Sequence, residues 1–218
     1  MNSLLQDHDS VLIKNYRGII GLDEVGRGAL AGPLVVAACH INTNLFHSKQ
    51  ILEISKEFKD SKKMSENKRE MAFKYLDQLK NANFIHYTIA FASVEEIDAL
   101  NISVATKNAF ERSLILLKSK LKSIHDYLIL IDGLPLKDFT FKHKSIISGD
   151  NKSFAIACAS ILAKVTRDRH MESLCKDIPD YKFSKNKGYG TIEHRNALRS
   201  YGPCTHHRKK FIRRILTD

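Results

Sequence analysis

Two adjacent carboxylates, Asp23 and Glu24, end an apolar run and stand directly before a glycine–arginine–glycine turn. Two further acids repeat the pattern, because Asp132 ends the run "YLILID" and Asp150 follows "SIISG". Open α/β sheets place their sites at the carboxyl ends of strands, so these acids are expected to meet. Taken singly, each is more often an ordinary turn or cap residue, and only the group points to chemistry.

A cluster of four carboxylates favours chemistry that requires a bound metal ion. An unpaired carboxylate in an apolar setting costs several kcal/mol, so a buried cluster of them needs compensation. Hard oxygen ligands suit a divalent cation such as magnesium. Two such ions roughly 3.5–4 Å apart can clamp the attacking and leaving oxygens of an in-line phosphoryl displacement. The sequence therefore predicts a two-metal site for phosphoryl transfer.

The turn after the first acid pair consists of Gly26, Arg27 and Gly28. Glycines let backbone amides approach a ligand closely, and the ribose 2′-hydroxyl is the group that separates RNA from DNA. A turn of this type can bring backbone amides to a 2′-hydroxyl, although the glycines alone do not establish that role. The alternative is that the glycines only shape a hairpin and that Arg27 pairs with an acid.

Strands must hold these acids, and the amino-terminal half predicts three of them in a meander. "GIIGLD" and "GPLVVAACHI" are short apolar runs on either side of the glycine-rich turn, and residues 84–92 alternate enough for a third strand. Before the third strand, residues 65–80 predict an amphipathic helix with Ser65 as its N-cap. The expected apolar face of that helix consists of Met71, Tyr75 and Leu79.

The next part of the chain continues the alternation of helix and strand. Residues 101–122 keep apolar positions at helical spacing, "DYLILIDG" predicts a buried parallel strand, and "KSIIS" predicts a short one. Residues 151–174 predict a helix whose small side chains allow close packing on a sheet: Ala155, Ala157, Ala159, Ser160 and Ala163. The expected fold class is α/β, a mixed sheet flanked by helices.

Length and charge predict one main domain with a basic appendage. The chain has 218 residues, 43% of them apolar, and a formal charge of +11; residues 182–214 hold ten lysines and arginines against one acid. A clustered positive surface attracts a polyanion, so nucleic acid is the expected partner; a solvated tail or a contact with an anionic membrane is the alternative. We divide the chain into a catalytic domain, residues 1–180, and a helical module, residues 181–218, with short helices from Thr191 and His206.

Several other classes are disfavoured. The first seventeen residues lack the apolar core of a signal peptide, and no run of about 18 apolar residues occurs. The four cysteines form no CxxC pair, which argues against a disulfide framework and favours a reducing, cytoplasmic compartment. Cys204, His206 and His207 lie within four residues and cannot alone close a tetrahedral zinc site.

Six ordered stretches carry most of these candidate residues: "DEVGRG", "DSKKM", "IDG", "SGD" with "ACASILAKVTRD", "KGYGTIEH" and "HRKKF". Together they resemble the motif set of bacterial ribonuclease HII, and the resemblance covers nearly the whole chain. The related ribonuclease HIII type has an additional amino-terminal domain and differs after its acid pair. Here the first strand starts near residue 18 and "GRG" follows the pair, which favours the HII type.

The resemblance implies an RNase H-like fold and hydrolysis, dependent on Mg²⁺ or Mn²⁺, of RNA paired with DNA, including single ribonucleotides embedded in duplex DNA. By position it assigns catalysis and metal binding to Asp23, Glu24, Asp132 and Asp150. It implies that Tyr189, which lies between two glycines, senses the RNA–DNA junction, where stacking contributes about 1–3 kcal/mol. If the turn binds the ribose and Tyr189 stacks on the adjoining sugar, the enzyme cuts on the 5′ side of the ribonucleotide. The products then have 3′-hydroxyl and 5′-phosphate ends.

Four further residues match family positions near backbone phosphates: Lys62, Ser160, Lys164 and Lys187. Lysine is a suitable point charge for such contacts. For Lys164 a structural alternative exists, because Asp168 lies one helical turn further on and could pair with it.

No clamp-binding tail follows Phe211, so we expect a monomer without an obligate protein partner. Three functional classes stay open at this point: the two-metal ribonuclease, another RNase H-like nuclease with the same acids, and a non-catalytic nucleic-acid-binding module. Cleavage indifferent to ribose would indicate the second class, and binding without metal-dependent cleavage would indicate the third.

Overall fold

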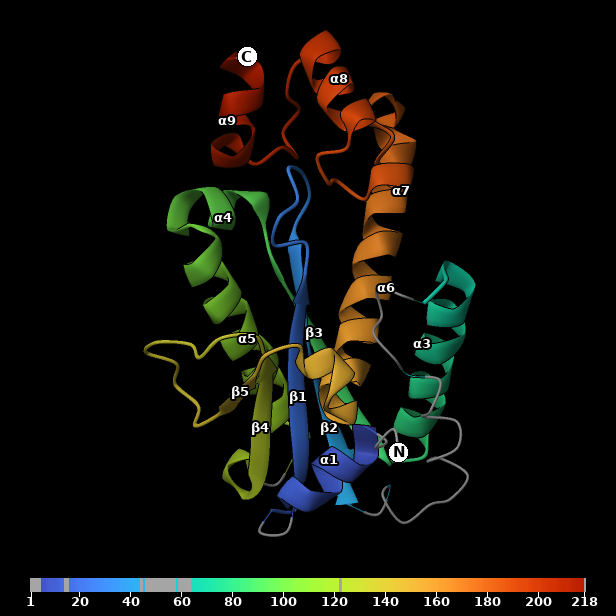
Figure 1. Cartoon of the computed structure of the whole chain (residues 1–218), viewed down its shortest axis with the longest axis vertical. Helices are drawn as coiled ribbons and strands as arrows, with labels where there is room; N and C mark the ends of the chain where they lie inside the picture. The colour runs from blue at the N-terminus through green and yellow to red at the C-terminus, as the bar shows by residue number, and fades with distance from the viewer. Residues whose placement is uncertain are drawn as a thin grey trace.

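The computed structural model has a central sheet with helices on both faces and a group of short helices at one end of its long axis (Figure 1). The structure describes residues 5–13, 16–43, 45, 58, 64–121 and 123–217.

The sheet has five strands in the order β3-β2-β1-β4-β5. The first three form an antiparallel meander, as predicted: β1 (Gly18–Val25), β2 (Leu34–Asn42) and β3 (Ile85–Ala92). The other two add in parallel beyond β1: β4 (Tyr127–Asp132) and β5 (Lys144–Ile146). The predicted buried parallel strand is therefore confirmed, and the carboxyl ends of β1 and β4 lie side by side.

One face of the sheet is covered by α6 (Phe154–Asp177), with α3 (Glu66–Asn81) outside it (Figure 1). The small residues of α6 permit a close approach to β1. A Cβ atom at Gly21 would lie 2.2 Å from the backbone carbon of Ala155, so only glycine fits at this crossing. The prediction of a helix packed tightly on the sheet is confirmed.

The helix α3 begins after Ser65, whose side chain accepts a hydrogen bond from the Lys68 amide, as predicted. Its buried residues are Phe73, Leu76 and Leu79, whereas Met71 is 70% exposed. The prediction was therefore right for Leu79, which is buried, and for Tyr75, which packs partly buried against the core, and wrong for Met71. The sequence offers two apolar stripes on this helix, and the positions of α6 and β3 decide which residues are buried.

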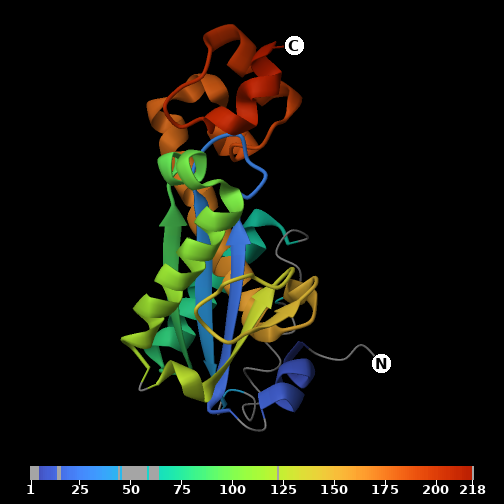
Figure 2. The same ribbon diagram turned by 90° about the vertical axis from the view of Figure 1, so that its left-hand side faces the viewer.

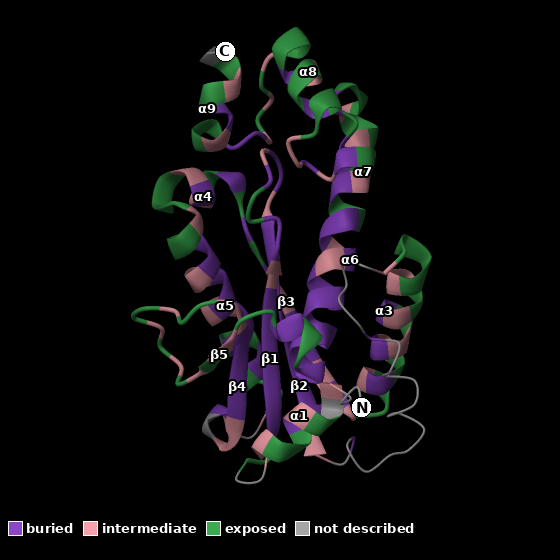
Figure 3. Cartoon of the chain, viewed as in Figure 1, coloured by how far each residue is buried: buried purple, intermediate pink, exposed green. Residues whose placement is uncertain are grey.

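The opposite face of the sheet is covered by α4 (Val94–Leu100) and α5 (Ile102–Lys118). Asn101 caps α5 by accepting hydrogen bonds from the amides of residues 103 and 104. The predicted apolar positions Phe110, Leu114 and Leu117 are buried against the sheet. Figure 3 shows the consequence: the strands and the sheet-facing helix surfaces are buried, and the outer helix surfaces are exposed.

The carboxy-terminal helices are short: η5 (Pro179–Tyr181), α7 (Phe183–Asn186), α8 (Ile192–Tyr201) and α9 (Lys209–Thr217). Figure 2 shows them together beyond the loop that joins β1 to β2. They share an apolar cluster with that loop and with the last turns of α6: Ala31, Met171, Leu174, Tyr181, Phe183, Leu198 and Ile212. The division of the chain at residue 180 stays a prediction.

The described residues also include three small elements: α1 (Leu5–Leu12), η3 (Ile124–Asp126) and η4 (Gly149–Asn151). Asp9 of α1 is fully buried and accepts hydrogen bonds, each 3.0 Å long, from the Ser153 hydroxyl and the Ala155 amide. It thereby satisfies one amide group and the N-cap hydroxyl at the start of α6. Among the described residues, no helix combines the length and the apolar character needed to cross a membrane.

Candidate active site

The carboxyl ends of β1 and β4 bring Asp23 and Asp132 next to each other. Leu22 pairs with Ile131 in the parallel register, so the two acids occupy the next position on neighbouring strands. Successive side chains alternate between the faces of a sheet. Both acids therefore face α6, as do Gly21 and Leu130 two residues earlier on the same strands.

Asp23 is 6% exposed and has an unfavourable environment for its charge. Burial raises the pKa of the Asp23 carboxyl well above its ordinary value, and the neighbouring charges of Glu24 and Asp132 raise it further. A hydrogen bond from the Ser160 side chain of α6 lowers it, as does the 2.7 Å bond from the Glu24 amide. Three carboxylates thus interact electrostatically at this edge of the sheet.

Glu24 follows on the strand, and its side chain lies toward the turn. Its carboxylate is 3.4 Å from the Arg27 guanidinium, which also donates to the Ser103 hydroxyl at 3.2 Å. The structural alternative for Arg27, pairing with an acid, is therefore present in this structure. Because the Arg27 side chain is half exposed, this ion pair contributes little to stability.

Asp150 lies in η4, which is tied to the end of β4. The Gly149 amide donates to an Asp132 carboxylate oxygen at 2.6 Å, so the loop that carries Asp150 is fixed against Asp132. Asp150 is 3% exposed and accepts a hydrogen bond from Asn151 at 3.1 Å. The loop that carries the fourth acid is thus joined to the third acid through the Gly149 amide.

The donor chemistry of these acids fits a hard divalent cation. Within the described part of the chain, no group of three or more His, Cys, Asp or Glu side chains lies close enough together to hold a metal ion. The set nevertheless consists of oxygen donors alone, and the raised pKa of Asp23 arises partly from like charges that a cation would offset. The side chains of Asp23, Glu24, Asp132 and Asp150 therefore have the donor chemistry that a hard divalent cation needs, and metal binding by these four acids stays a prediction.

The predicted ribose-reading turn is a four-residue turn, closed by a hydrogen bond from the Ala29 amide to the Gly26 carbonyl. Gly26 has a φ of +96°, and a Cβ atom there would lie 2.2 Å from Arg167. Packing and backbone conformation thus both require glycine at position 26. At Gly28 a Cβ atom would meet nothing within 4 Å, so packing does not explain the second glycine.

The loop of residues 187–190 lies against the segment that follows this turn. The Gly188 carbonyl accepts hydrogen bonds from the amides of Leu30, at 2.8 Å, and Ala31, at 3.3 Å. A Cβ atom at Gly188 would lie 2.4 Å from the Ala31 carbonyl oxygen. Two motifs some 160 residues apart in the sequence therefore meet, and Tyr189 is half-buried between them.

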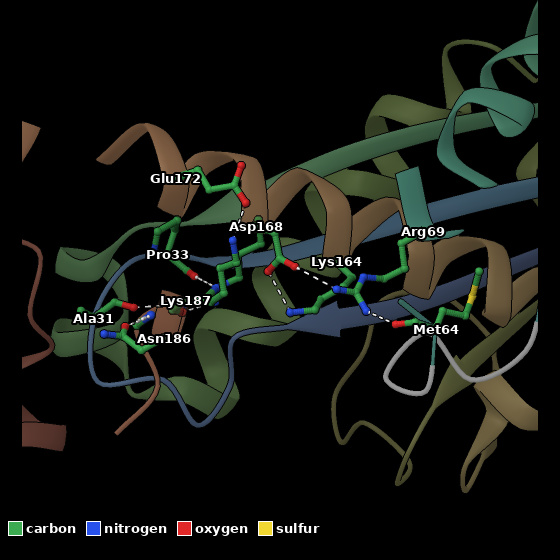
Figure 4. Close-up of polar contacts among 11 residues, drawn as sticks. Ala31, Pro33, Met64, Arg69, Lys164, Asp168, Glu172, Asn186 and Lys187 are labelled. Atoms are coloured by element: carbon green, nitrogen blue, oxygen red, sulfur yellow. Dashed lines mark hydrogen bonds and ion pairs between the residues drawn. The ribbon is translucent and has the colours of Figure 1, made fainter. Parts of the chain in front are cut away.

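The predicted phosphate-contacting residues have partners inside the protein. Ser160 is 1% exposed and interacts with Asp23. Lys164 donates to Asp168 at 2.8 Å, and Lys187 forms an ion pair with Glu172 (Figure 4). The structural alternative for Lys164 is thus present, although contact with a phosphate stays a prediction for all three. Lys62 lies outside the described residues.

Two arginines that sequence reasoning did not single out are completely buried. Arg167 and Arg208 are each 0% exposed, and their guanidinium groups donate to backbone carbonyls of the turn segment and of the 187–190 loop. Both lie inside motifs, "VTRD" and "HRKKF". Sequence alone did not identify them, because a buried arginine among other lysines and arginines cannot be distinguished from an exposed one by residue type.

The fold and the carboxylates at its strand ends define the class of RNase H-like nucleases. The family model "Ribonuclease HII" matches residues 20–215. A ribonuclease HII of Caldicellulosiruptor bescii is 41% identical over 209 residues, which cover 96% of this chain and 93% of that protein. The chain therefore belongs to the ribonuclease HII family.

Two solved structures show the same fold. The PCNA:RNase HII complex from Archaeoglobus fulgidus matches with a TM-score of 0.67 at 23% identity, over 88% of this chain and 93% of that one. Bst-RNase HIII in complex with Mn²⁺ matches with a TM-score of 0.67 at 17% identity, over 95% of this chain and 67% of that one.

Family membership decides among the three functional classes left open by the sequence. The chain is an endoribonuclease that cleaves the RNA of RNA/DNA hybrids and cleaves at ribonucleotides embedded in DNA. Its substrate is nucleic acid, and its family uses divalent metal ions. The predicted family, fold class and activity are thereby confirmed.

Proposed function

We propose that Asp23, Glu24, Asp132 and Asp150 hold two divalent ions, Mg²⁺ or Mn²⁺, and that the enzyme cuts on the 5′ side of a ribonucleotide. The observation that carries this proposal is the environment of Asp23. Its carboxyl is buried beside two other acids with a strongly raised pKa, an arrangement that is unfavourable for a structural residue and favourable for a metal ligand.

The bound ions would supply stabilisation of the charge that develops on the phosphate and an activated water molecule. The chain supplies geometry. Ser160 and the Glu24 amide orient the Asp23 carboxylate, and the Gly149 amide orients Asp132. These ligands are held by two strands and a helix, which keeps them in place during the reaction.

Recognition of the ribose belongs, in this proposal, to the turn and to Tyr189. The N–H groups of Arg27 and Gly28 take no part in the hydrogen bond that closes the turn. They can therefore donate to a 2′-hydroxyl, while Tyr189 stacks on the adjoining sugar. With the turn on the ribose and Tyr189 on the adjoining sugar, the scissile phosphate is the one on the 5′ side of the ribonucleotide. The departing 3′-oxygen then belongs to the preceding deoxynucleotide.

A duplex DNA with a single ribonucleotide tests the proposal. In the presence of Mg²⁺ or Mn²⁺ we expect one nick, with a 3′-hydroxyl and a 5′-phosphate, and none with EDTA. Attack by the 2′-hydroxyl of the ribose itself would cut on the 3′ side and leave a cyclic phosphate. Cyclic ends, or cleavage that persists in EDTA, would refute the metal mechanism.

Replacing Tyr189 with alanine should lower cleavage at a single embedded ribonucleotide about 5- to 150-fold, because a stacking contact worth about 1–3 kcal/mol is removed. The metal concentration that gives half-maximal activity should not change, since no ligand is lost. The control is Tyr201→Ala on α8, where the tyrosine is 63% exposed. Normal cleavage by Tyr189→Ala would show that this side chain has no role in recognition.

Neutralising the basic face of α9 should weaken binding to any duplex. Four exposed residues form this face: Lys209, Lys210, Arg213 and Arg214. Each phosphate contact that is lost should reduce the slope of log K against log salt by about 0.9, because fewer counterions are released. The measurement is fluorescence anisotropy over a salt series, with the exposed pair Lys74→Gln and Lys118→Gln as the control. An unchanged slope would place the phosphate-binding surface elsewhere.

We further propose that the enzyme is a cytoplasmic monomer, with residues 1–180 as its catalytic domain and residues 181–218 as a substrate-binding module. The shared apolar cluster joins the second part to α6 and to Ala31, so the module would be fixed beside the turn. The archaeal relative was solved as a PCNA:RNase HII complex, and a clamp partner is the alternative to an independent monomer.

A further inference from the structure

Arg208 lies directly behind the turn that would read the ribose. Its guanidinium donates to the Gly26 carbonyl at 2.7 Å and to the Arg27 carbonyl at 3.2 Å. Its Nε and Nη2 atoms donate to the Gly32 carbonyl at 3.0 and 2.8 Å. One buried side chain of the carboxy-terminal module therefore holds both ends of the loop between β1 and β2.

These bonds fix the direction of two peptide groups. In a trans peptide the C=O and the following N–H point in opposite directions. Because the carbonyls of Gly26 and Arg27 point inward to Arg208, the N–H groups of Arg27 and Gly28 must point outward. These are the two donors that the proposed recognition of a 2′-hydroxyl requires.

Arg167 of α6 braces the same arrangement from the other side. Its guanidinium donates to the carbonyls of Pro33 at 2.9 Å, Ala31 at 3.1 Å and Lys187 at 2.7 Å. It also lies 5.3 Å from the centre of the Tyr189 ring. The close-up in Figure 4 shows Pro33, Ala31 and Lys187 gathered at this part of α6. The ribose-reading turn and the tyrosine loop are therefore held in one frame.

The two guanidinium groups are buried, and backbone carbonyls replace their water. Burial lowers the pKa of Arg208 to about 9, and the charge of Arg167 contributes to the decrease. Burial also lowers the pKa of Arg167. A guanidinium has a planar fork of donors that can bind several carbonyls at once, whereas a lysine has a point charge.

We propose that Arg208, braced by Arg167, is a positioning residue that makes the enzyme specific for ribose by aiming the amides of Arg27 and Gly28 at the 2′-hydroxyl. The proposal rests on the proposed recognition of ribose by the turn. It assigns to the motif "HRKKF" a role in specificity that is separate from the attraction of phosphates by the rest of the basic module.

The test compares the binding of two duplexes in EDTA by fluorescence anisotropy. One is all DNA, and the other has a single ribonucleotide. The wild type should prefer the second. Arg208→Lys keeps the positive charge but loses the planar set of guanidinium donors. The ratio of its affinities for the ribonucleotide duplex and the all-DNA duplex should therefore fall about tenfold, while its affinity for the all-DNA duplex is retained. A purely structural loss would instead weaken both duplexes equally. Arg199→Lys, an exposed arginine of α8, should keep the preference.

The outcomes separate the two proposals. A wild type without preference for the ribonucleotide overturns both of them. If the wild type prefers the ribonucleotide duplex and a folded Arg208→Lys variant keeps that preference, only the role of Arg208 is overturned. If that variant does not fold, Arg167→Lys is measured in its place. A retained preference for the ribonucleotide duplex then overturns the proposal that Arg167 holds Arg208 and the turn in position.

Hydrogen exchange on the wild type gives a further readout that needs no variant. The Arg27 and Gly28 amides should exchange rapidly in the free protein. They should be slowed by the ribonucleotide duplex and not by all-DNA duplex. Slow exchange in the free protein would mean that these amides do not point outward, and would overturn the proposal.

Discussion

Replacing Asp23 with asparagine is expected to abolish metal-dependent cleavage, by about 10³-fold or more, while the metal-free protein stays folded and becomes more stable. A ligand that stabilises the transition state through the metal contributes several kcal/mol, and each 1.36 kcal/mol is about tenfold in rate. Asp150→Asn should lower the activity similarly, because it removes another charge from the same set.

The gain in stability should depend on pH in a defined direction. The pKa of Asp23 is raised in the folded protein above its ordinary value of 3.8. Folding is therefore penalised when this group must ionise, and the penalty grows as pH rises above about 4. Because asparagine does not ionise, the Tm advantage of Asp23→Asn should be present at neutral pH and vanish near pH 3.

Cleavage of a single-ribonucleotide duplex and thermal unfolding in EDTA measure the two effects. The matched control is Asp138→Asn, because Asp138 is an exposed carboxylate away from the cluster. It should change neither quantity. Near-normal cleavage by Asp23→Asn would remove this residue from the metal site, and a lower Tm at neutral pH would show that its charge is compensated within the protein.

Gly21→Ala is expected to have the largest effect on stability. The added methyl group would lie 2.2 to 2.4 Å from the backbone of Ala155 and Ile156. Flexible side chains cannot absorb such a clash, so α6 must move away from β1 or β1 must bend. We expect a loss of about 3 kcal/mol or more in the free energy of unfolding. Activity should also fall, because Ser160 of α6 orients Asp23 two residues further along β1.

Urea unfolding measures this loss, with Gly28→Ala as the control. A methyl group at Gly28 would meet nothing within 4 Å, so this variant should keep the stability of the wild type. It should nevertheless lose cleavage at ribonucleotides if the turn reads the 2′-hydroxyl, because the methyl group then blocks the approach of the sugar. A stable Gly21→Ala would mean that α6 does not pack as closely as the structure describes.

Much of the fold could be predicted from local patterns. The runs ending in Asp23 and Asp132 have strand length and strand composition, and the turn glycines lie between two such runs. Ser65 was recognisable as an N-cap, and a short helix was recognisable from Thr191 onward. The candidate acids could be found because several of them follow apolar strand runs, and this repetition is more informative than any single acid.

Other features depended on long-range contacts. The sequence places two apolar stripes on α3, and packing against α6 and β3 buries Phe73 and Leu76 rather than Met71. The pairing of Lys164 with Asp168 was indicated by their spacing of four residues. The lysine at position 187, in contrast, looked available for phosphates, but the fold brings Glu172 to it. A partner that is close only in the folded chain leaves no local signal.

The sequence by itself determined the strands, the order of the motifs and the identity of the acids, because these depend on residue type and short-range spacing. Only the tertiary structure decided that Arg167 and Arg208 are buried against the β1–β2 loop and donate to its carbonyls. The physical reason is that a guanidinium can leave water only where acceptors replace its hydration, and here those acceptors are several converging backbone carbonyls. That convergence is created when the β1–β2 loop, α6 and the carboxy-terminal module pack together, and no local stretch of sequence encodes it.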